Sequence, residues 1–213
     1  MSRRKRAVVY VDGFNFYHGV IRGGDPQNKW LDLERLFGLI RNQEDLVLVR
    51  YFTAEMWGEA RQRQAVYLDA LKTLPMVHVR TSIFKKKPVK GRYGPNNALK
   101  VRIETFEEKE TDVALAVSMI DDAYNDRADV FVLVSSDTDF VPPLELLHDT
   151  FPNKDVVVYI PSRNWDKAAE LRRFDAHRFP ERMLELARFP EIVRSADDRR
   201  IERPSQWASV PEH

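Results

Sequence analysis

Four aspartates follow or open segments that have the pattern of buried strands and helices. Asp12 follows one apolar run of strand length, and Asp137 and Asp139 follow another. Asp112 opens a segment of helical period. If the two strands are neighbours in a parallel sheet, their carboxyl ends lie at the same edge. All four carboxylates would then converge at that edge.

Such a cluster of carboxylates needs a cation, or protons, to be stable. Two unit charges about 4 Å apart repel by roughly 4 kcal/mol at an effective dielectric constant near 20. Because every candidate ligand is an oxygen, the matching ions are hard cations, Mg²⁺ or Mn²⁺, which retain water and bind substrate phosphate. A metal that contacts a phosphodiester activates water and stabilises the charge of the transition state. The cluster therefore leads to phosphodiester hydrolysis as a hypothesis.

Each acid also has a structural interpretation. Asp12 begins an Asp–Gly pair of the kind that ends many strands, and Asp112 and Asp139 are placed as helix N-caps or first-turn acids. Asp137 is harder to explain in this way, because one cap is enough for one helix. Asn15 lies one helical turn after Asp12, where it would either cap locally or hold the Asp12 carboxylate and a phosphate. Taken together, the acids favour a functional site.

The segments that must position these acids alternate between strand and helix patterns. This alternation predicts a parallel sheet covered by helices on both faces, an α/β three-layer sandwich in which ligands bind beyond the carboxyl ends of the strands. The expected strands are 7–11, 46–52, 76–84, 130–134 and 156–160, and the expected helices are 14–21, 31–40, 59–74, 112–124, 140–147 and 165–173. In the helix of 112–124 we expect Val113, Ala116, Val117 and Ile120 to face inward.

The composition sets limits on these predictions. The chain has 213 residues, 43% of them hydrophobic, which is enough for one large domain that we place at 1–189. The absence of cysteine excludes disulfides, zinc ribbons and cysteine nucleophiles. No apolar run is long enough for a membrane span and no secretory signal is recognisable, so we expect a cytoplasmic protein with no membrane partner. The charged, aperiodic segment 190–213 predicts a tail that contacts a second copy or a partner protein.

A basic insertion at about 85–102 leads directly into the acid-bearing helix. It contains Lys85, Lys86, Lys87 and Arg92, whereas the whole chain has a net charge of only +1. Neutralising about six phosphates of a single strand gives a log–log salt slope of roughly −4 to −5. The insertion therefore favours contact with RNA, with a solvated lysine-rich hairpin as the structural alternative.

Three blocks of residues combine these features in a fixed order. They are Val11–Tyr17 (VDGFNFY), Lys109–Ala116 (KETDVALA) and Val134–Phe140 (VSSDTDF). Over about 7–179 the chain thereby resembles the NYN domain family of PIN-like nucleases. The resemblance implies a Rossmann-like, PIN-type fold and ribonuclease chemistry that depends on Mg²⁺ or Mn²⁺.

The resemblance also implies roles for individual residues. The acids that match the family's metal ligands and catalytic residues are Asp12, Asp112, Asp137 and Asp139. Asn15 matches the motif asparagine, a catalytic and phosphate-binding position, and Lys109 matches a lysine that often precedes the helix acid. RNA is the implied substrate, and Lys85, Lys86, Lys87 and Arg92 would bind it.

Two departures from the family pattern support an alternative. Ser118 stands where many members carry a further aspartate, and Ser136 replaces a frequent glycine. The change at Ser118 favours a catalytically weak or inactive RNA-binding module as the second hypothesis. A phosphatase with an aspartate nucleophile is disfavoured, because Phe14 occupies the position where that chemistry usually needs a second acid.

Overall fold

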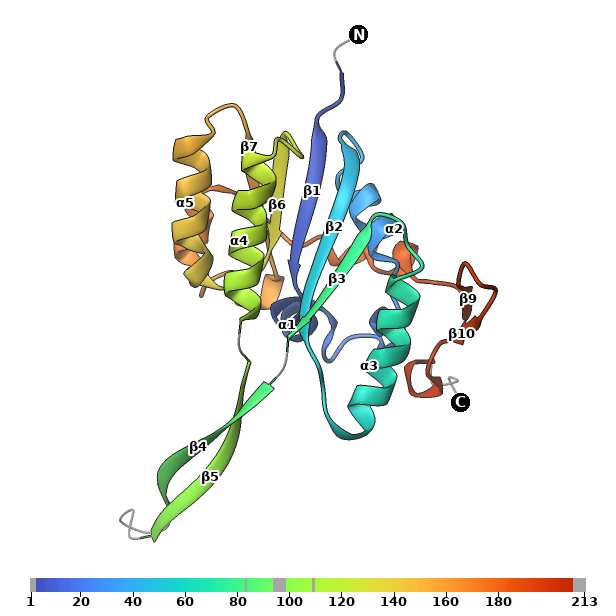
Figure 1. Cartoon of the computed structure of the whole chain (residues 1–213), viewed down its shortest axis with the longest axis vertical. Helices are drawn as coiled ribbons and strands as arrows, with labels where there is room; N and C mark the ends of the chain where they lie inside the picture. The colour runs from blue at the N-terminus through green and yellow to red at the C-terminus, as the bar shows by residue number, and fades with distance from the viewer. Residues whose placement is uncertain (1–2, 83, 94–98, 109, 209–213) are drawn as a thin grey trace.

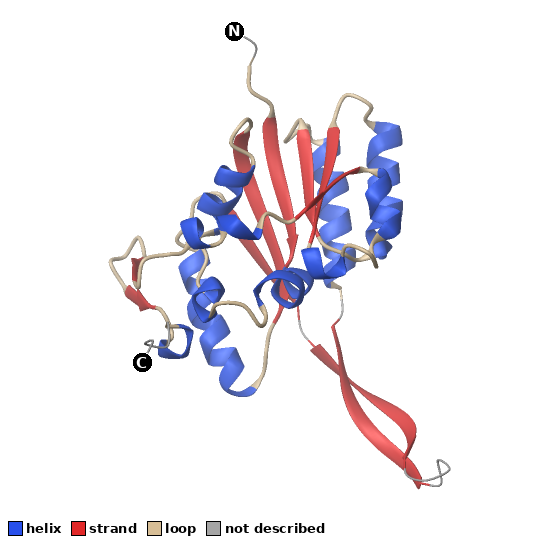
Figure 2. Cartoon of the chain, turned by 180° about the vertical axis from the view of Figure 1, so that it is seen from behind, coloured by secondary structure: helices blue, strands red, loops and turns tan. Residues whose placement is uncertain are grey.

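The computed structural model shows a six-stranded sheet with helices on both faces (Figure 1, Figure 2). It describes residues 3–82, 84–93, 99–108 and 110–208, with 84–93 and 99–108 described by their backbone alone. The strand order is β3–β2–β1–β6–β7–β8, and every neighbouring pair is parallel. The strands are β1 (Arg6–Asp12), β2 (Asp45–Ala54), β3 (Val77–Ser82), β6 (Val130–Val134), β7 (Asp155–Ile160) and β8 (Asp175–Arg178). The predicted α/β fold with a parallel central sheet is confirmed.

Helices cover both faces of the sheet (Figure 1). Helices α2 (Leu33–Ile40) and α3 (Gly58–Leu71) pack on one face, and α4 (Thr111–Tyr124) and α5 (Val141–Thr150) pack on the other. Among the described residues, no helix combines the length and the apolar character needed to cross a membrane.

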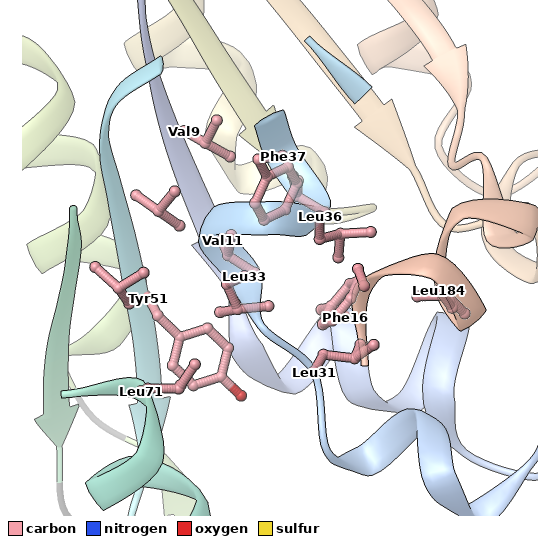
Figure 3. Packing of buried hydrophobic residues seen from close by; sticks show 14 of the residues in the cluster. Val9, Val11, Phe16, Leu31, Leu33, Leu36, Phe37, Tyr51, Leu71 and Leu184 are labelled. Atoms are coloured by element: carbon pink, nitrogen blue, oxygen red, sulfur yellow. The ribbon is translucent and has the colours of Figure 1, made fainter. Parts of the chain in front are cut away.

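The side chains of the central strands alternate between two cores. Val9 and Val11 of β1 belong to the core under α2 and α3, and Val8 and Tyr10 belong to the core under α4 and α5. Figure 3 shows the first core, in which side chains of β1, β2, α2 and α3 meet. A strand covered on both faces must be apolar where it is buried between them, as β1 is from Ala7 to Val11. These cores hold the carboxyl ends of the central strands in place.

Short helical turns follow the carboxyl ends of the strands. After β1 come α1 (Gly13–Phe16) and the π-helical turn η1 (Tyr17–Ile21). After β6 comes the 3₁₀ turn η4 (Thr138–Phe140), and after β7 comes η5 (Ser162–Asn164). Further 3₁₀ turns among the described residues are η2 (Pro26–Lys29), η6 (Ala169–Arg173), η7 (Glu181–Met183) and η8 (Glu185–Ala187).

The basic insertion forms an antiparallel hairpin of β4 (Phe84–Tyr93) and β5 (Leu99–Glu108). It lies between the carboxyl end of β3 and the start of α4, and it extends away from the sheet (Figure 1). The hairpin therefore leaves the domain at the edge where the strands end.

Helix α4 buries a different face from the predicted one. Ala114, Leu115 and Met119 lie in the second core, whereas Val113 and Val117 are 68% and 61% exposed. The prediction that these two valines face inward was wrong. Apolar residues occur on more than one side of this helix, so hydrophobic periodicity alone does not decide which side meets the sheet.

The carboxy-terminal segment also differs from the predicted tail. Val193, Ile201 and Trp207 are buried in the first core, together with residues of α2 and α3. The elements of this segment are β9 (Ile192–Arg194), β10 (Arg200–Glu202) and the turn η9 (Ser205–Trp207). Three apolar side chains, spaced among charged ones without a helix or strand period, are enough to anchor the segment as far as residue 208.

A buried carboxylate joins α4 to β1 and β2. Asp122 is fully buried, and Arg50 donates to both of its oxygens at 2.7 Å. The Tyr10 hydroxyl donates to Asp122 Oδ2 at 2.8 Å, and Arg127 Nε lies 2.9 Å from Oδ1. This acid is therefore satisfied by structural partners within the second core.

Replacing Arg50 with methionine removes the bidentate partner of this buried carboxylate. We expect the free energy of unfolding to fall by about 3–5 kcal/mol, measured by urea denaturation. Arg61→Met is the matched control, because it breaks an exposed ion pair with Glu55 and should change stability by less than about 1 kcal/mol. Equal effects of the two substitutions would contradict the structural role of the network.

Asp129 joins the starts of β1 and β6. Its Oδ2 accepts from the Arg6 backbone N–H at 2.8 Å, and its Oδ1 lies 2.9 Å from Arg6 Nη2. The hydrogen-bonded Arg6 guanidinium holds the pKa of this carboxyl well below its usual range. A lowered acid pKa stabilises the fold above the ordinary pKa, and this contribution is lost as the pH falls below about 4 toward the folded-state value.

Asp129→Asn should therefore lower the free energy of unfolding by about 1–2 kcal/mol at pH 7. Below pH 4 the free energy of unfolding should fall less steeply in this variant than in the parent. Urea denaturation of both proteins at pH 7, 4 and 3 measures this difference. Parallel stability curves over the whole range would contradict it.

Candidate functional site

The carboxyl ends of β1 and β6 lie side by side at one edge of the sheet. Val11 pairs with Val134 in parallel register, so Asp12 and the residues after Val134 leave the sheet together. Gly13 is required here for packing, because a Cβ at this position would lie 2.6 Å from the backbone oxygen of Phe52. The predicted neighbourhood of the two strand ends is thus confirmed.

Asp12 is a buried carboxylate that is held by three donors. Only 2% of the residue is exposed. Its Oδ1 accepts from the Asn15 backbone N–H at 3.0 Å, and its Oδ2 accepts from Asn15 Nδ2 at 2.7 Å and from the Ser135 hydroxyl at 2.9 Å. Asp12 therefore caps α1. Asn15 holds the Asp12 carboxylate, which was one of the two roles predicted for Asn15.

Ser135 connects the two strand ends through a single hydroxyl group. Ser135 is fully buried, and its Oγ donates to Asp12 and accepts from the Asp137 backbone N–H at 3.0 Å. The Asp137 side chain, which is half-buried, in turn accepts from the Asp139 backbone N–H at 3.0 Å. Asp137 is thus the N-cap of η4 and Asp139 is a first-turn acid, one of its two predicted structural roles. Asp137 therefore has the capping role that the sequence made harder to assign to it.

A second row of polar side chains supports the first. The Ser136 hydroxyl donates to Asn15 Oδ1 and accepts from Asn164 Nδ2 at 2.8 Å. Asn164 is positioned by η5, which packs closely on η1: a Cβ on Gly19 would lie 2.4 Å from Pro161 Cβ. The Asn15 amide is therefore oriented from both ends.

The other two predicted acids lie on the surface. Asp139 is exposed in η4, and Asp112 is exposed in the first turn of α4, a helix that contacts β1 and η4. Among the residues that the structure describes, no three acidic, histidine or cysteine side chains are grouped so as to hold a metal ion. The predicted convergence of four carboxylates is therefore not present in this arrangement of side chains.

The predicted basic residues fall outside what the structure describes in atomic detail. Lys85, Lys86, Lys87 and Arg92 lie on β4, whose side chains are not described. Lys109 lies outside the described residues. Their contact with RNA stays a prediction.

The electrostatics of Asp12 suit a cation. Burial raises the pKa of the Asp12 carboxyl above its usual range, the hydrogen bonds from Asn15 and Ser135 lower it, and the nearby charge of Asp137 raises it again. A dication beside Asp12 and Asp137 would compensate both the desolvation and the repulsion. Mg²⁺ commonly binds through one or two carboxylates, with water and substrate phosphate as its other ligands. The oxygen donors of this site fit that requirement.

Sequence reasoning missed Ser135 and Asn164 as site residues and treated Ser136 only as a departure from the family pattern. All three follow the carboxyl end of a strand in the parallel sheet, β6 or β7. The same topological rule that identified the acids would have identified them. Their hydroxyl and amide groups carry no charge, so a pattern of charged residues does not identify them.

Three comparisons place this chain among known proteins. The NYN domain family model matches residues 6–180, which include both strand ends of the site. The chain is 28% identical to 6-hydroxy-3-succinoylpyridine 3-monooxygenase HspA of Pseudomonas putida, over 99% of this chain and 78% of that protein. Its fold is similar to the crystal structure of a protein of unknown function from Vibrio parahaemolyticus, with a TM-score of 0.52, 16% identity and coverage of 85% of this chain and 97% of that one. From the extent of the family match, the chain belongs to the NYN domain family.

Proposed function

We propose that this protein is a metal-dependent ribonuclease that hydrolyses phosphodiester bonds of RNA. The observation that carries the proposal is the buried Asp12 carboxylate, held by Asn15 and Ser135 at the end of β1 beside Asp137. Membership of the NYN family, which is nuclease-like, agrees with it.

In this proposal Asp12 and Asp137 hold a Mg²⁺ or Mn²⁺ ion. Such an ion, when bound, lowers the pKa of a coordinated water and stabilises charge on the phosphate oxygens. Asp112 and Asp139, exposed on the two neighbouring turns, supply further carboxylates on the outer side of the site. They would contact the ion through water or after a change of rotamer.

The polar partners of Asp12 would act by positioning. Three donors fix the direction of its two oxygens, so little reorganisation is needed when the charge of the substrate arrives. Asn15 uses one amide N–H for Asp12, and its second N–H is available chemically for a phosphate oxygen. Lys109, next to the Asp112 helix, would add a positive charge at the same phosphate.

The hairpin of β4 and β5 would bind the part of the RNA strand that extends beyond the Asp12 site. It leaves the domain at the edge where Asp12 lies, and β4 carries Lys85, Lys86, Lys87 and Arg92. Charge neutralisation by these residues would make binding depend strongly on salt.

Cleavage of a labelled single-stranded RNA tests the proposal. We expect turnover with Mn²⁺ or Mg²⁺, none with EDTA, and a loss of at least about 100-fold in Asp137→Asn, as expected when a group that stabilises the transition state is removed. Asp149→Asn, an exposed acid at the far end of α5, is the control and should cleave like the parent. Cleavage that persists in EDTA or in Asp137→Asn would rule out this mechanism. RNA binding without turnover in any divalent metal would select the inactive binding module.

Two substitutions of Asp137 separate its charge from its capping role. Asparagine is also a good N-cap, so Asp137→Asn keeps the bond to the Asp139 N–H and removes repulsion with Asp12. We expect its thermal midpoint without metal to equal or exceed that of the parent. Asp137→Ala loses the cap and should cost about 1 kcal/mol. Marked destabilisation by the asparagine variant would instead assign the carboxylate a structural role.

A second candidate function is oxygenation of a heteroaromatic acid. It is favoured by the similarity to the Pseudomonas putida monooxygenase over 99% of this chain. The printed name of that protein places the oxygenation at ring carbon 3, which carries the succinoyl group. Such a reaction would form a C–O bond at this carbon from one atom of O₂ and break its bond to the acyl group, which would leave with the OH of a water molecule as succinate. A two-electron donor would reduce the other oxygen atom to water. Consumption of O₂ that depends on 6-hydroxy-3-succinoylpyridine and a reduced nicotinamide would support it, and no consumption with any reductant would exclude it.

A further inference from the structure

A cavity of about 170 Å³ lies next to the carboxylate site. Residues of α1 and η1 form one side of it, and residues of β2 and α3 form the other. Gly13, which follows Asp12 directly, lines this cavity, and a Cβ on Gly13 would lie 2.9 Å from the hydroxyl oxygen and Cζ of Tyr51, a side chain labelled in Figure 3. The cavity and the Asp12 carboxylate are thus separated by one residue.

Aromatic rings form much of the cavity wall. At the outer side, Phe14 is 48% exposed and packs against His18 in a tilted arrangement, with ring centroids 4.3 Å apart and planes at 42°. On the inner side, Tyr67 makes edge contacts with Tyr51 and Trp207 at centroid distances of 6.4 and 6.3 Å. An exposed ring beside a partly enclosed apolar space is a surface on which another flat ring can stack.

The His18 ring is suited to stacking because it is neutral. Burial lowers the pKa of His18, and the charge of Arg22 lowers it further. Arg22 Nη1 lies 3.2 Å from His18 Nδ1, so Nδ1 accepts and Nε2 carries the proton. At neutral pH the imidazole therefore presents an uncharged face.

The surface of the cavity is mostly apolar, and Gln64 is one of its fixed polar groups. Gln64 donates to the Ala54 carbonyl at 2.8 Å and accepts from the Met56 N–H at 2.8 Å, which holds its amide in place. Thr53, 7% exposed, lines the same wall; its hydroxyl accepts from Gln64 Nε2 at 3.5 Å and is able to donate to the edge of a heterocycle. A mostly apolar pocket with a few fixed polar groups is typical of a site for a small organic ligand.

Two cations lie at the cavity and favour an anionic ligand. Lys29 and Arg63 are both among its lining residues. Arg63 is paired with Glu59 at 3.6 Å, but the Glu59 side chain is 91% exposed, so this pair is screened by water. A ring that carries a phosphate would meet both the aromatic wall and a positive charge.

We infer that this cavity binds one nucleobase of the RNA, with the attached phosphate directed to Lys29 and Arg63. The inference rests on the proposed ribonuclease function and adds a base-recognition site to it. The volume is below the roughly 300 Å³ of sites for drug-sized ligands, which suits a single ring system without its sugar. Thr53 would contact the edge of the bound base, and Phe14 would stack on the next base of the RNA.

The test measures binding of the four nucleoside 5′-monophosphates by calorimetry in EDTA, where no metal-dependent cleavage occurs. We expect at least one nucleotide to bind and ribose 5-phosphate to bind at least about tenfold more weakly, because the phosphate alone does not fill the aromatic cavity. Equal binding of ribose 5-phosphate and of every nucleotide, or no binding of any nucleotide, would overturn the inference.

Two variants of α3 locate the binding. Ala60, half-buried, lines the cavity, and Ala65, exposed, does not. Ala60→Phe fills the space and should weaken nucleotide binding by about tenfold or more, whereas Ala65→Phe should bind like the parent. Circular dichroism and thermal midpoints check that both variants fold. Unchanged affinity in a folded Ala60→Phe would overturn the inference.

A further variant keeps the test valid if Ala60→Phe does not fold. Lys29→Gln removes a charge from the half-buried rim and should weaken nucleotide monophosphates but not nucleosides. Unchanged binding of the monophosphates, or an equal loss for monophosphates and nucleosides, would contradict the predicted contact with phosphate.

The two proposals fail in distinguishable ways. Nucleotide binding in EDTA together with full cleavage by Asp137→Asn would contradict the metal mechanism and support the nucleobase cavity. Loss of cleavage in Asp137→Asn, with unchanged cleavage in Ala60→Phe and no nucleotide binding, would have the opposite meaning. It would support the ribonuclease mechanism and contradict the nucleobase cavity. Binding of 6-hydroxy-3-succinoylpyridine in place of every nucleotide would overturn the nucleobase assignment in favour of the second candidate function.

Discussion

The buried Asp12 carboxylate is the group on which the arrangement of the site depends. A carboxylate with 2% exposure is stable as an anion only when donors replace the water that it has lost. Asn15 supplies two of these donors from the next helical turn, and Ser135 supplies the third from the neighbouring strand. The residual desolvation, with the charge of Asp137 beside it, leaves a site to which a dication would be attracted. The burial of Asp12 therefore explains both the hydrogen bonds that hold its carboxylate and the proposed affinity of the site for a dication.

The edge of the sheet combines this carboxylate site with an apolar cavity on the other side of α1. The short first helix makes the combination feasible, because Gly13 allows α1 to approach β2 so closely that one residue separates the two environments. At the opposite edge, Arg6 and Asp129 hold the starts of β1 and β6 together. The strand ends that carry function are thus kept in register by interactions that are distant from them.

Sequence reasoning succeeded where the interaction is local or follows from the topology of a parallel sheet. Asp12 and Asn15 are three residues apart, so their contact is a property of one helical turn. The neighbourhood of Asp12 and Asp137 follows once β1 and β6 pair. The assignment of the cap at η4 and of the buried face of α4 was less successful. In both places more than one residue had the right chemical type, and only packing decided between them.

The sequence by itself determined the α/β class, the pairs of strands that had to be apolar on both faces, and the acids at their carboxyl ends, because hydrophobic period and strand-end position are encoded locally. The tertiary structure alone decided that Ser135, Ser136 and Asn164 complete the polar network and that the last described segment packs into the core through Val193, Ile201 and Trp207. It also decided that Phe14, Tyr51 and Tyr67 enclose a cavity. These features join residues that are far apart in the chain. Their formation depends on how the helices settle on the sheet, which no local pattern of residues records.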